Sequence, residues 1–142
     1  MPQASETGLP AHEPEGSGAQ DMVGYHVTLD DPDGSAVVRL AIEDRHLNRN
    51  GTLHGGIHAM MLDAAAGFAA SRWFSGAQQQ LVPVVTLSLT TSFVAAVAQG
   101  EVVVTGWVTG GGHKTVFGAA ETRDARGRVI STASGVFKRA SS

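Results

Sequence analysis

A single carboxylate stands out in an otherwise apolar stretch of the sequence. Between Arg49 and Arg72, the only acidic or basic side chain apart from His54 and His58 is that of Asp63. A carboxylate in so apolar a segment is costly to bury unless it is paired with another group or used in chemistry. We therefore expect Asp63 to act as a general base or as a nucleophile, and the structural alternative is a salt bridge across an interface.

Two glycines precede this acid at the predicted start of a helix. A helix N-terminus presents unpaired N–H groups and the positive end of the helix dipole. Because glycine has no side chain to block a ligand, the amides of Gly55 and Gly56 could bind a carbonyl oxygen as an oxyanion hole. Such a pair is often only a turn, and a histidine such as His54 is more often structural. Together with the isolated Asp63, however, they favour a functional site.

The composition limits the class of protein. The chain has 142 residues, of which 42% are hydrophobic and 16% charged, so we expect one folded domain. A net charge of -3 without a basic run argues against nucleic acid as a partner, and the absence of cysteine excludes disulfides and thiolate chemistry. The sequence shows neither a signal peptide nor an apolar stretch long enough to span a membrane, so we expect a cytoplasmic protein.

The elements that must position these residues follow the order of two strands, one long helix and four strands. The short turns between the strands favour an antiparallel sheet, and a single helix packed on it gives an α+β layered fold. Residues 1–22 are polar and small and are predicted to be a flexible tail, with the domain at 23–139. The periodicity predicts strands at 25–29, 36–42, 82–93, 101–108, 113–122 and 128–138, and a helix at 54–72.

Side-chain periodicity also predicts which faces are buried. A stripe on the helix contains Ile57, Met60, Met61, Ala64, Ala65 and Phe68, while the small residues on its other faces would let a neighbour approach the backbone. In the strand at 82–93, simple alternation places Val85, Leu87, Leu89 and Phe93 on one face and Thr86, Ser88, Thr90 and Ser92 on the other.

The loop and helix together resemble a known family. Asn48, the run from Gly51 to Gly56 and Asp63 resemble the hot-dog-fold acyl-CoA thioesterases, most closely the phenylacetate-degradation (PaaI-like) subgroup of the 4-hydroxybenzoyl-CoA thioesterase superfamily. The resemblance covers about residues 24–138 and includes the segments 84–89, 112–115 and 124–128. It implies a sheet wrapped around a central helix, assembled as a homodimer or homotetramer with sites between subunits.

The resemblance also implies roles for individual residues. Gly55 would be the main amide donor to the thioester oxygen, with the side-chain amide of Asn48 assisting. Asp63 would be the base or the nucleophile, Thr86 would orient the water or the carboxylate, and His54 would shape the site and hold the water. Taken alone, Thr86 is best explained as an ordinary strand residue. Asn48 and Asn50 both fit loop residues that bond their own backbone, and the spacing of six to His54 makes Asn48 the better match to the family.

The substrate implied by the resemblance is an acyl-CoA, and an aryl or hydroxylated aryl acyl group is one candidate. Gly56 is assigned to contacts with the substrate. The phosphates of CoA need cations, for which the sequence offers Lys114, Lys138 and Arg139. We predict no metal and no cofactor, because CoA is part of the substrate.

Other chemistries fit the sequence less well. His54 and His58 have the i, i+4 spacing of two zinc ligands, but no Glu lies between them and Asp63 is not the expected third ligand, so we interpret His58 as structural. No serine lies in a nucleophile-elbow context. Two alternatives to a hydrolase are kept: a hydratase or dehydratase acting on acyl thioesters, and a non-catalytic acyl-CoA-binding module.

Overall fold

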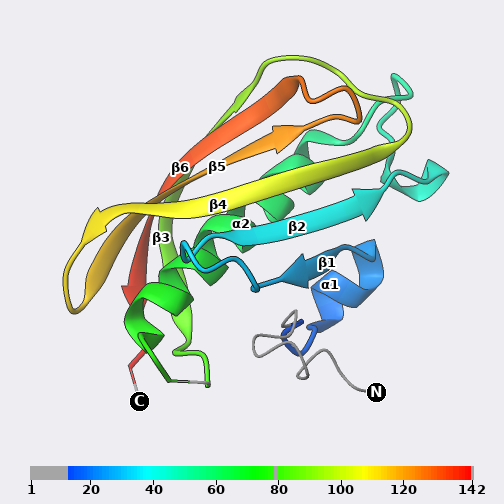
Figure 1. The fold of residues 1–142 in the computed structure, drawn as a ribbon. Coiled ribbons are helices and arrows are strands. Elements are labelled where there is room, and N and C mark those ends of the chain that lie inside the picture. Colours follow the sequence, from blue (N-terminus) through cyan, green and yellow to red (C-terminus); the bar gives the residue numbers. More distant parts are fainter. Residues whose placement is uncertain (1–12, 79, 142) are drawn as a thin grey trace.

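A long helix, α2 (Gly55–Ser75), lies against the inner side of a curved six-stranded antiparallel sheet in the computed structural model (Figure 1). The structure describes residues 13–78 and 80–141. The strand order is β1-β2-β4-β5-β6-β3, which confirms the predicted α+β class and the predicted order of the main elements. The other elements are α1 (Gly18–Val23), β1 (His26–Thr28), β2 (Ala36–Ala41), η2 (Asp44–His46), β3 (Val84–Phe93), β4 (Glu101–Gly111), β5 (Thr115–Arg123) and β6 (Val129–Arg139).

The helix approaches the sheet closely because small residues meet at the contact. A Cβ atom added to Gly106 of β4 would lie 2.3 Å from the backbone carbonyl of Ala65, so only glycine fits there. The predicted buried stripe is therefore partly wrong, since the small side chains bring a neighbouring face of the helix against the sheet. The fully buried apolar residues of α2 are Met61, Leu62, Ala65, Ala66, Ala69 and Ala70, whereas Ile57, Met60, Ala64 and Phe68 are half-buried.

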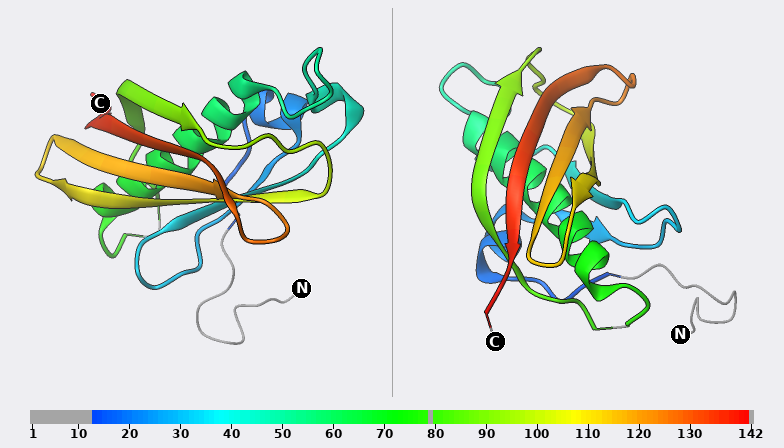
Figure 2. Two further views of the ribbon diagram at one scale, coloured as in Figure 1. Left: turned by 90° about the horizontal axis from the view of Figure 1, so that it is seen from above. Right: turned by 90° about the vertical axis from the view of Figure 1, so that its left-hand side faces the viewer.

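A second face of α2 is not fully covered by its own chain. The sheet curves around the helix and ends in two edge strands, β1 and β3 (Figure 2). The half-buried residues on this face include Ala59, Met60, Asp63, Ala64 and Gly67. Asp63 is thus surrounded by small residues on a face that another group can approach.

An irregularity in β3 changes which of its side chains face the helix. The pairing of β3 with β6 shifts register between Thr86 and Ser88, which marks a β-bulge. Thr86 pairs with Phe137, which is fully buried, so Thr86 lies on the helix side of the sheet. The predicted alternation, which put Thr86 on the face opposite Leu89 and Phe93, is wrong because the bulge inserts one residue into the period.

The segment before the sheet includes a short helix. The hydroxyl of Ser17 accepts a 3.1 Å hydrogen bond from the Gln20 amide at the start of α1, and Gly24 ends the helix with a φ of 91°. Because Gln20 and Val23 are buried, the packed structure begins earlier than the boundary at residue 22 suggested. The rest of the predicted tail, residues 1–12, lies outside the described residues.

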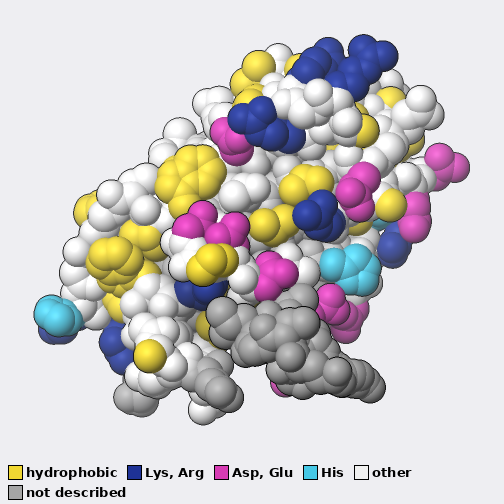
Figure 3. All heavy atoms as spheres, viewed as in Figure 1, with side chains coloured by type: hydrophobic (Ala, Val, Ile, Leu, Met, Phe, Trp, Pro, Cys, Tyr) yellow, Lys and Arg dark blue, Asp and Glu magenta, His cyan; other side chains and the backbone are white. Residues whose placement is uncertain are grey.

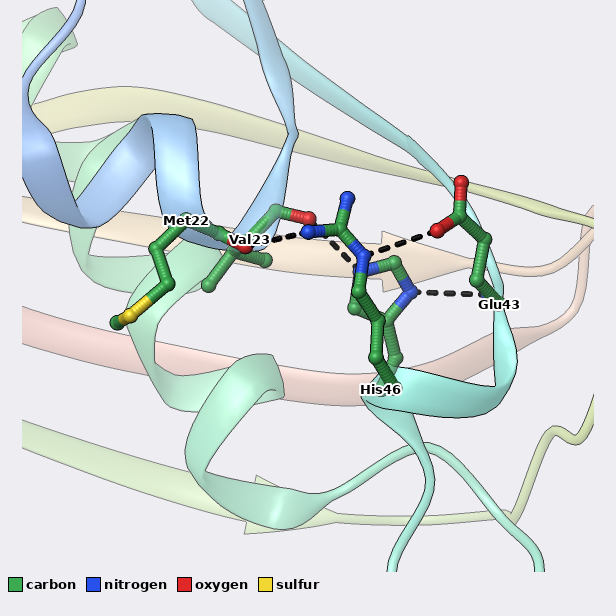
Figure 4. A network of polar contacts seen from close by, with 5 residues as sticks. Met22, Val23, Glu43 and His46 are labelled. Carbon is green, nitrogen blue, oxygen red and sulfur yellow. Dashed lines mark hydrogen bonds and ion pairs between the residues drawn. The ribbon is translucent and has the colours of Figure 1, made fainter.

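A polar network ties α1 to the loop that leads into α2 (Figure 4). Arg45 donates to the Met22 carbonyl over 2.6 Å and to the Glu43 carboxylate over 2.9 Å. His46 Nδ1 accepts from the Glu43 amide at 2.9 Å, so its Nε2–H donates to the Val23 carbonyl at 2.7 Å. Since the His46 carbonyl in turn accepts from the His54 amide at 2.9 Å, this network fixes the start of α2.

Within the described part of the chain, no helix combines the length and the hydropathy that a membrane crossing requires.

Candidate active site

The first turn of α2 leaves one amide without a partner among the described residues. His54 caps the helix: its Nδ1 accepts from the Gly56 amide at 2.8 Å, and its carbonyl accepts from the amides of Ile57 and His58 at 2.9 and 3.1 Å. The Gly55 amide donates to none of the described residues. Of the two glycine amides proposed from the sequence, Gly55 is therefore the one free to bind an oxygen, while Gly56 is occupied by the cap.

Asn48 organises the loop ahead of the helix. Its Oδ1 accepts from the backbone amides of Asn50 and Thr52 at 2.9 and 3.1 Å, and its Nδ2 donates to the Thr52 hydroxyl at 3.1 Å. An amide nitrogen carries two hydrogens, so Nδ2 has one left for a ligand. Asn48 lines the same cavity as Gly55, which is compatible with both the loop role and the assisting role considered above.

Asp63 and Thr86 are brought together from different elements. The Thr86 hydroxyl donates to the Asp63 carboxylate over 2.7 Å, from the edge strand β3 to the middle of α2. Asp63 is half-buried and forms no ion pair with the described residues of its own chain. The carboxylate keeps a second oxygen that can accept a proton or attack a carbon.

Tyr25 lies near this carboxylate and was missed by the sequence analysis. Burial raises the pKa of Tyr25, and the nearby Asp63 carboxylate raises it further, so the phenol stays protonated. Tyr25 is only 7% exposed, just ahead of β1. Its proximity to Asp63 depends on how the sheet curls around the helix, and nothing in the local sequence pattern signals it.

A shallow cavity of about 380 Å³ lies beside the start of α2. His58, which the sequence analysis treated as structural, is part of its wall. His58 Nδ1 lies 2.8 Å from the Ser131 hydroxyl, and the His58 and Phe93 rings pack edge to face with their centroids 5.5 Å apart. His58 lies three residues after Gly55, a spacing that puts both on the same face of a helix, and this is the signal in the sequence that places His58 beside Gly55. The lining residues are Asn48, Thr52, Leu53, Gly55, His58, Phe93, Val94, Ala95 and Ala96.

Gly55 and Asp63 of one chain cannot serve the same carbonyl group. Asp63 lies eight residues after Gly55 in α2, and a rise of about 1.5 Å per residue separates them by about 12 Å along the helix axis. An oxyanion donor must lie about 3 Å from the oxygen, and the base or nucleophile must be equally close to the reacting centre. One chain therefore carries the candidate oxyanion donor and the candidate base or nucleophile at different places on its surface.

The cations predicted to bind phosphate lie at the far end of the helix. Lys138 pairs with Thr115, and the carbonyl of Lys114 accepts from the Arg139 amide at 2.9 Å. The turn that carries Lys114 is attached to the last turns of α2, because Trp73 Nε1 donates to the Gly112 carbonyl at 3.2 Å.

Other cations lie closer to Gly55. Arg126 and Arg128 line a cavity of about 320 Å³ that shares Ala96 with the cavity beside Gly55. Basic side chains gather over the β5–β6 hairpin at the top of Figure 3. The chain thus offers two groups of cations at opposite ends of α2.

Comparisons with known proteins identify the family of the chain. The family model described as "Thioesterase superfamily" matches residues 50–131. A protein of Pseudomonas aeruginosa named a "putative esterase" is 31% identical over 118 residues, which are 82% of this chain and 84% of that protein.

Solved structures share the fold. One is a "putative esterase" from Mycobacterium tuberculosis, with a TM-score of 0.79 and 22% identity over 89% of this chain and 98% of that one. Another is the PaaI protein of the phenylacetic acid degradation operon of Escherichia coli, with a TM-score of 0.76 and 20% identity over 88% of this chain and 86% of that one. The α+β hot-dog fold expected from the sequence is confirmed.

Proposed function

Because the chain belongs to the thioesterase superfamily, and is a thioester hydrolase with a PaaI-like hot-dog fold, we propose that it hydrolyses an acyl-CoA to the free acid and CoA. The observation that carries this proposal is the hydrogen bond from Thr86 to Asp63, which aims a carboxylate at the open face of α2. The Gly55 amide, which donates to no residue in the described ranges, supports it, because it can hold the negative oxygen of a tetrahedral intermediate.

We further propose that two copies of the chain form each site. Since the two groups are separated along α2, a substrate carbonyl held by Gly55 of one chain would meet Asp63 of the other. The exposed edge strand β3 supports this assembly, because Val85 and Leu87 on it are 47% and 56% exposed. Pairing of β3 with β3 of a second copy would continue the sheet and cover the half-open face of α2, which gives Asp63 the dry setting expected from the sequence. A homotetramer would add further contacts of the same kind.

The chemistry follows from these positions. The Gly55 amide, assisted by Asn48 Nδ2, polarises the thioester carbonyl and stabilises the oxyanion. Asp63 either takes a proton from a water molecule that attacks the carbonyl carbon, or attacks that carbon itself to form an anhydride that water then cleaves. In both routes the carbon–sulfur bond breaks and CoA leaves as the thiolate. In the first route the thiolate takes up the proton that Asp63 removed from the water, and in the second it takes up a proton released when water cleaves the anhydride. Thr86 holds the carboxylate in the orientation that either route needs.

Two groups of cations could contact the CoA phosphates. Lys114 and Lys138 are the prediction from the sequence, and Arg126 and Arg128 lie closer to Gly55 within one chain. Replacing each pair in turn by glutamine shows which pair binds the phosphates. Loss of a phosphate contact raises the KM for CoA thioesters and leaves the hydrolysis of thioesters without phosphate unchanged. We also propose that the protein acts in the cytoplasm.

The direct test of the hydrolase is the release of free CoA from a panel of short, long and aromatic acyl-CoAs. We expect Asp63→Asn to slow the release by a factor of about 10² or more while the fold is kept. Normal turnover by a folded Asp63→Asn protein would refute the role of Asp63. Hydration of an enoyl thioester without release of thiol would instead identify a hydratase.

A further inference from the structure

His58 is held in one tautomer by its partner. The Ser131 hydroxyl lies 2.8 Å from His58 Nδ1, and Ser131 is fully buried. A buried hydroxyl must donate its hydrogen to an acceptor, and Nδ1 is the one partner that Ser131 Oγ has among the described residues. The hydroxyl therefore donates to Nδ1, and the ring carries its own hydrogen on Nε2.

His58 borders the cavity, and its Nε2–H group has no partner among the described residues. His58 is only 3% exposed, yet it lines the cavity beside Gly55. Nε2 forms no hydrogen bond with a described residue. It also keeps some exposed surface, because Thr122 Oγ1 is the one fully buried side-chain polar atom that lacks a partner in the described part of the chain. Side chains on a helix point toward its N-terminus, so the ring lies over the first turn, next to the Gly55 amide.

The surroundings define what this group can bind. Near His58 the wall contains apolar side chains, among them Leu53, Phe93 and Val94, and its polar groups include the uncharged amides of Gly55 and Asn48. Burial lowers the pKa of His58, which keeps the ring uncharged near neutral pH. A neutral donor in this uncharged wall suits an uncharged oxygen such as a hydroxyl, keto or amide oxygen, because a carboxylate or phosphate would be poorly solvated there.

We propose that His58, oriented by Ser131, determines substrate specificity by donating a hydrogen bond from Nε2 to an uncharged oxygen of the thioester substrate close to the reacting carbonyl. This proposal rests on the proposed function. The oxygen belongs either to the acyl group, as a hydroxyl or keto substituent, or to an amide of the pantetheine arm.

Three variants separate the donor from the packing. His58→Phe keeps an aromatic ring against Phe93 and removes the donor, His58→Gln keeps an N–H donor, and Ser131→Ala removes the group that orients the ring. Each is assayed with matched acyl-CoAs that differ by one hydroxyl group on the acyl chain. The same acyl groups are also presented as propanethiol esters, which lack the pantetheine amides.

We expect His58→Phe to lower kcat/KM by about tenfold or more for substrates that carry the oxygen, and His58→Gln to restore most of it. Loss restricted to the hydroxylated acyl-CoAs assigns the oxygen to the acyl group. Equal loss for all CoA thioesters, without loss for the propanethiol esters, assigns it to the pantetheine arm. Ser131→Ala should shift the ratio between matched substrates in the same direction, which a purely structural role would not do.

The proposal is overturned if His58→Phe melts near the wild-type temperature and hydrolyses every thioester within about twofold of the wild type. If, in that case, the wild type is active and Asp63→Asn is inactive, only the role of His58 has failed and the proposed function stands. A wild type that releases no thiol from any substrate refutes the proposed function itself, and the role of His58 falls with it.

Discussion

The Thr86 hydroxyl donates a 2.7 Å hydrogen bond to the Asp63 carboxylate and so links the edge strand β3 to the middle of α2. The contact depends on the bulge after Thr86, which turns this side chain to the helix side of the sheet. Without the bulge, Thr86 would lie on the outer face, and the carboxylate would have no partner in β3.

Removing the Thr86 hydroxyl should impair catalysis more than folding. Thr86→Val keeps the shape of the side chain, so we expect a fall in kcat of about tenfold or more, because the carboxylate loses the hydrogen bond that orients it. Thr86→Ser is the matched control and should stay within a few-fold of the wild type. Steady-state release of free thiol measures both, and equal activity of Val and Ser variants would contradict the role of the hydroxyl.

The Gly55 amide can be deleted without disturbing the helix. Gly55 is the first residue of α2, a position where proline is favoured, and the extended backbone of His54, with φ −62° and ψ 133°, suits the residue before a proline. We expect Gly55→Pro to lower kcat by a factor of about 10² to 10³, because one oxyanion donor is lost. Gly55→Ala keeps the amide, and its Cβ would meet the Phe93 ring at an ordinary 3.5 Å. A Pro variant as active as the Ala variant would exclude this amide from the reaction.

Gly106 should tolerate no side chain. A Cβ there would lie 2.3 Å from the backbone of Ala65, which cannot move aside without displacing α2. We expect Gly106→Ala to lower the free energy of unfolding by about 3 kcal/mol or more. Gly110→Ala, in the same strand with nothing within 4 Å of the added atom, is the control and should be close to neutral. Urea denaturation of both variants measures the difference, and similar midpoints would show that the helix and sheet are less closely packed.

Stability should depend on pH through His58. Burial lowers the pKa of His58 below its ordinary value of 6.5, so the unfolded chain binds a proton in a range of pH where the folded protein does not. The free energy of unfolding contributed by this group is fully present above the ordinary pKa and is lost as the pH falls toward the lowered one. Between pH of about 7.5 and about 5, the wild type should therefore lose more stability than His58→Phe. If the free energy of unfolding of the wild type and of His58→Phe, measured by urea denaturation, changes equally with pH, the ring is not held neutral by burial.

The elements were predictable because their side-chain periods are strong. The helix at 54–72 and the strand at 101–108 were placed correctly to within three residues at each end, since apolar spacing marks both kinds of element. The buried face of α2 was predicted less well. A pattern of large apolar residues such as Ile57 and Phe68 does not reveal that Ala65 and Gly106 allow the closest approach.

The site was only partly predictable. The isolated position of Asp63 was visible in the sequence, but its contact with Thr86 depends on a one-residue bulge that simple alternation does not reveal. The proximity of Tyr25 to Asp63 and of Ser131 to His58 depends on the curvature of the sheet. Such contacts join residues that are distant in the sequence, and no local pattern encodes them.

Each site is proposed to take its oxyanion donor from one chain and its carboxylate from another. The most direct measurement uses dimers that contain one Gly55→Pro chain and one Asp63→Asn chain, purified through a different affinity tag on each. Each parent dimer should be nearly inactive. The mixed dimer should recover about half of the wild-type kcat, because one of its two sites then has both groups intact. A mixed dimer no more active than either parent would contradict a site shared between chains.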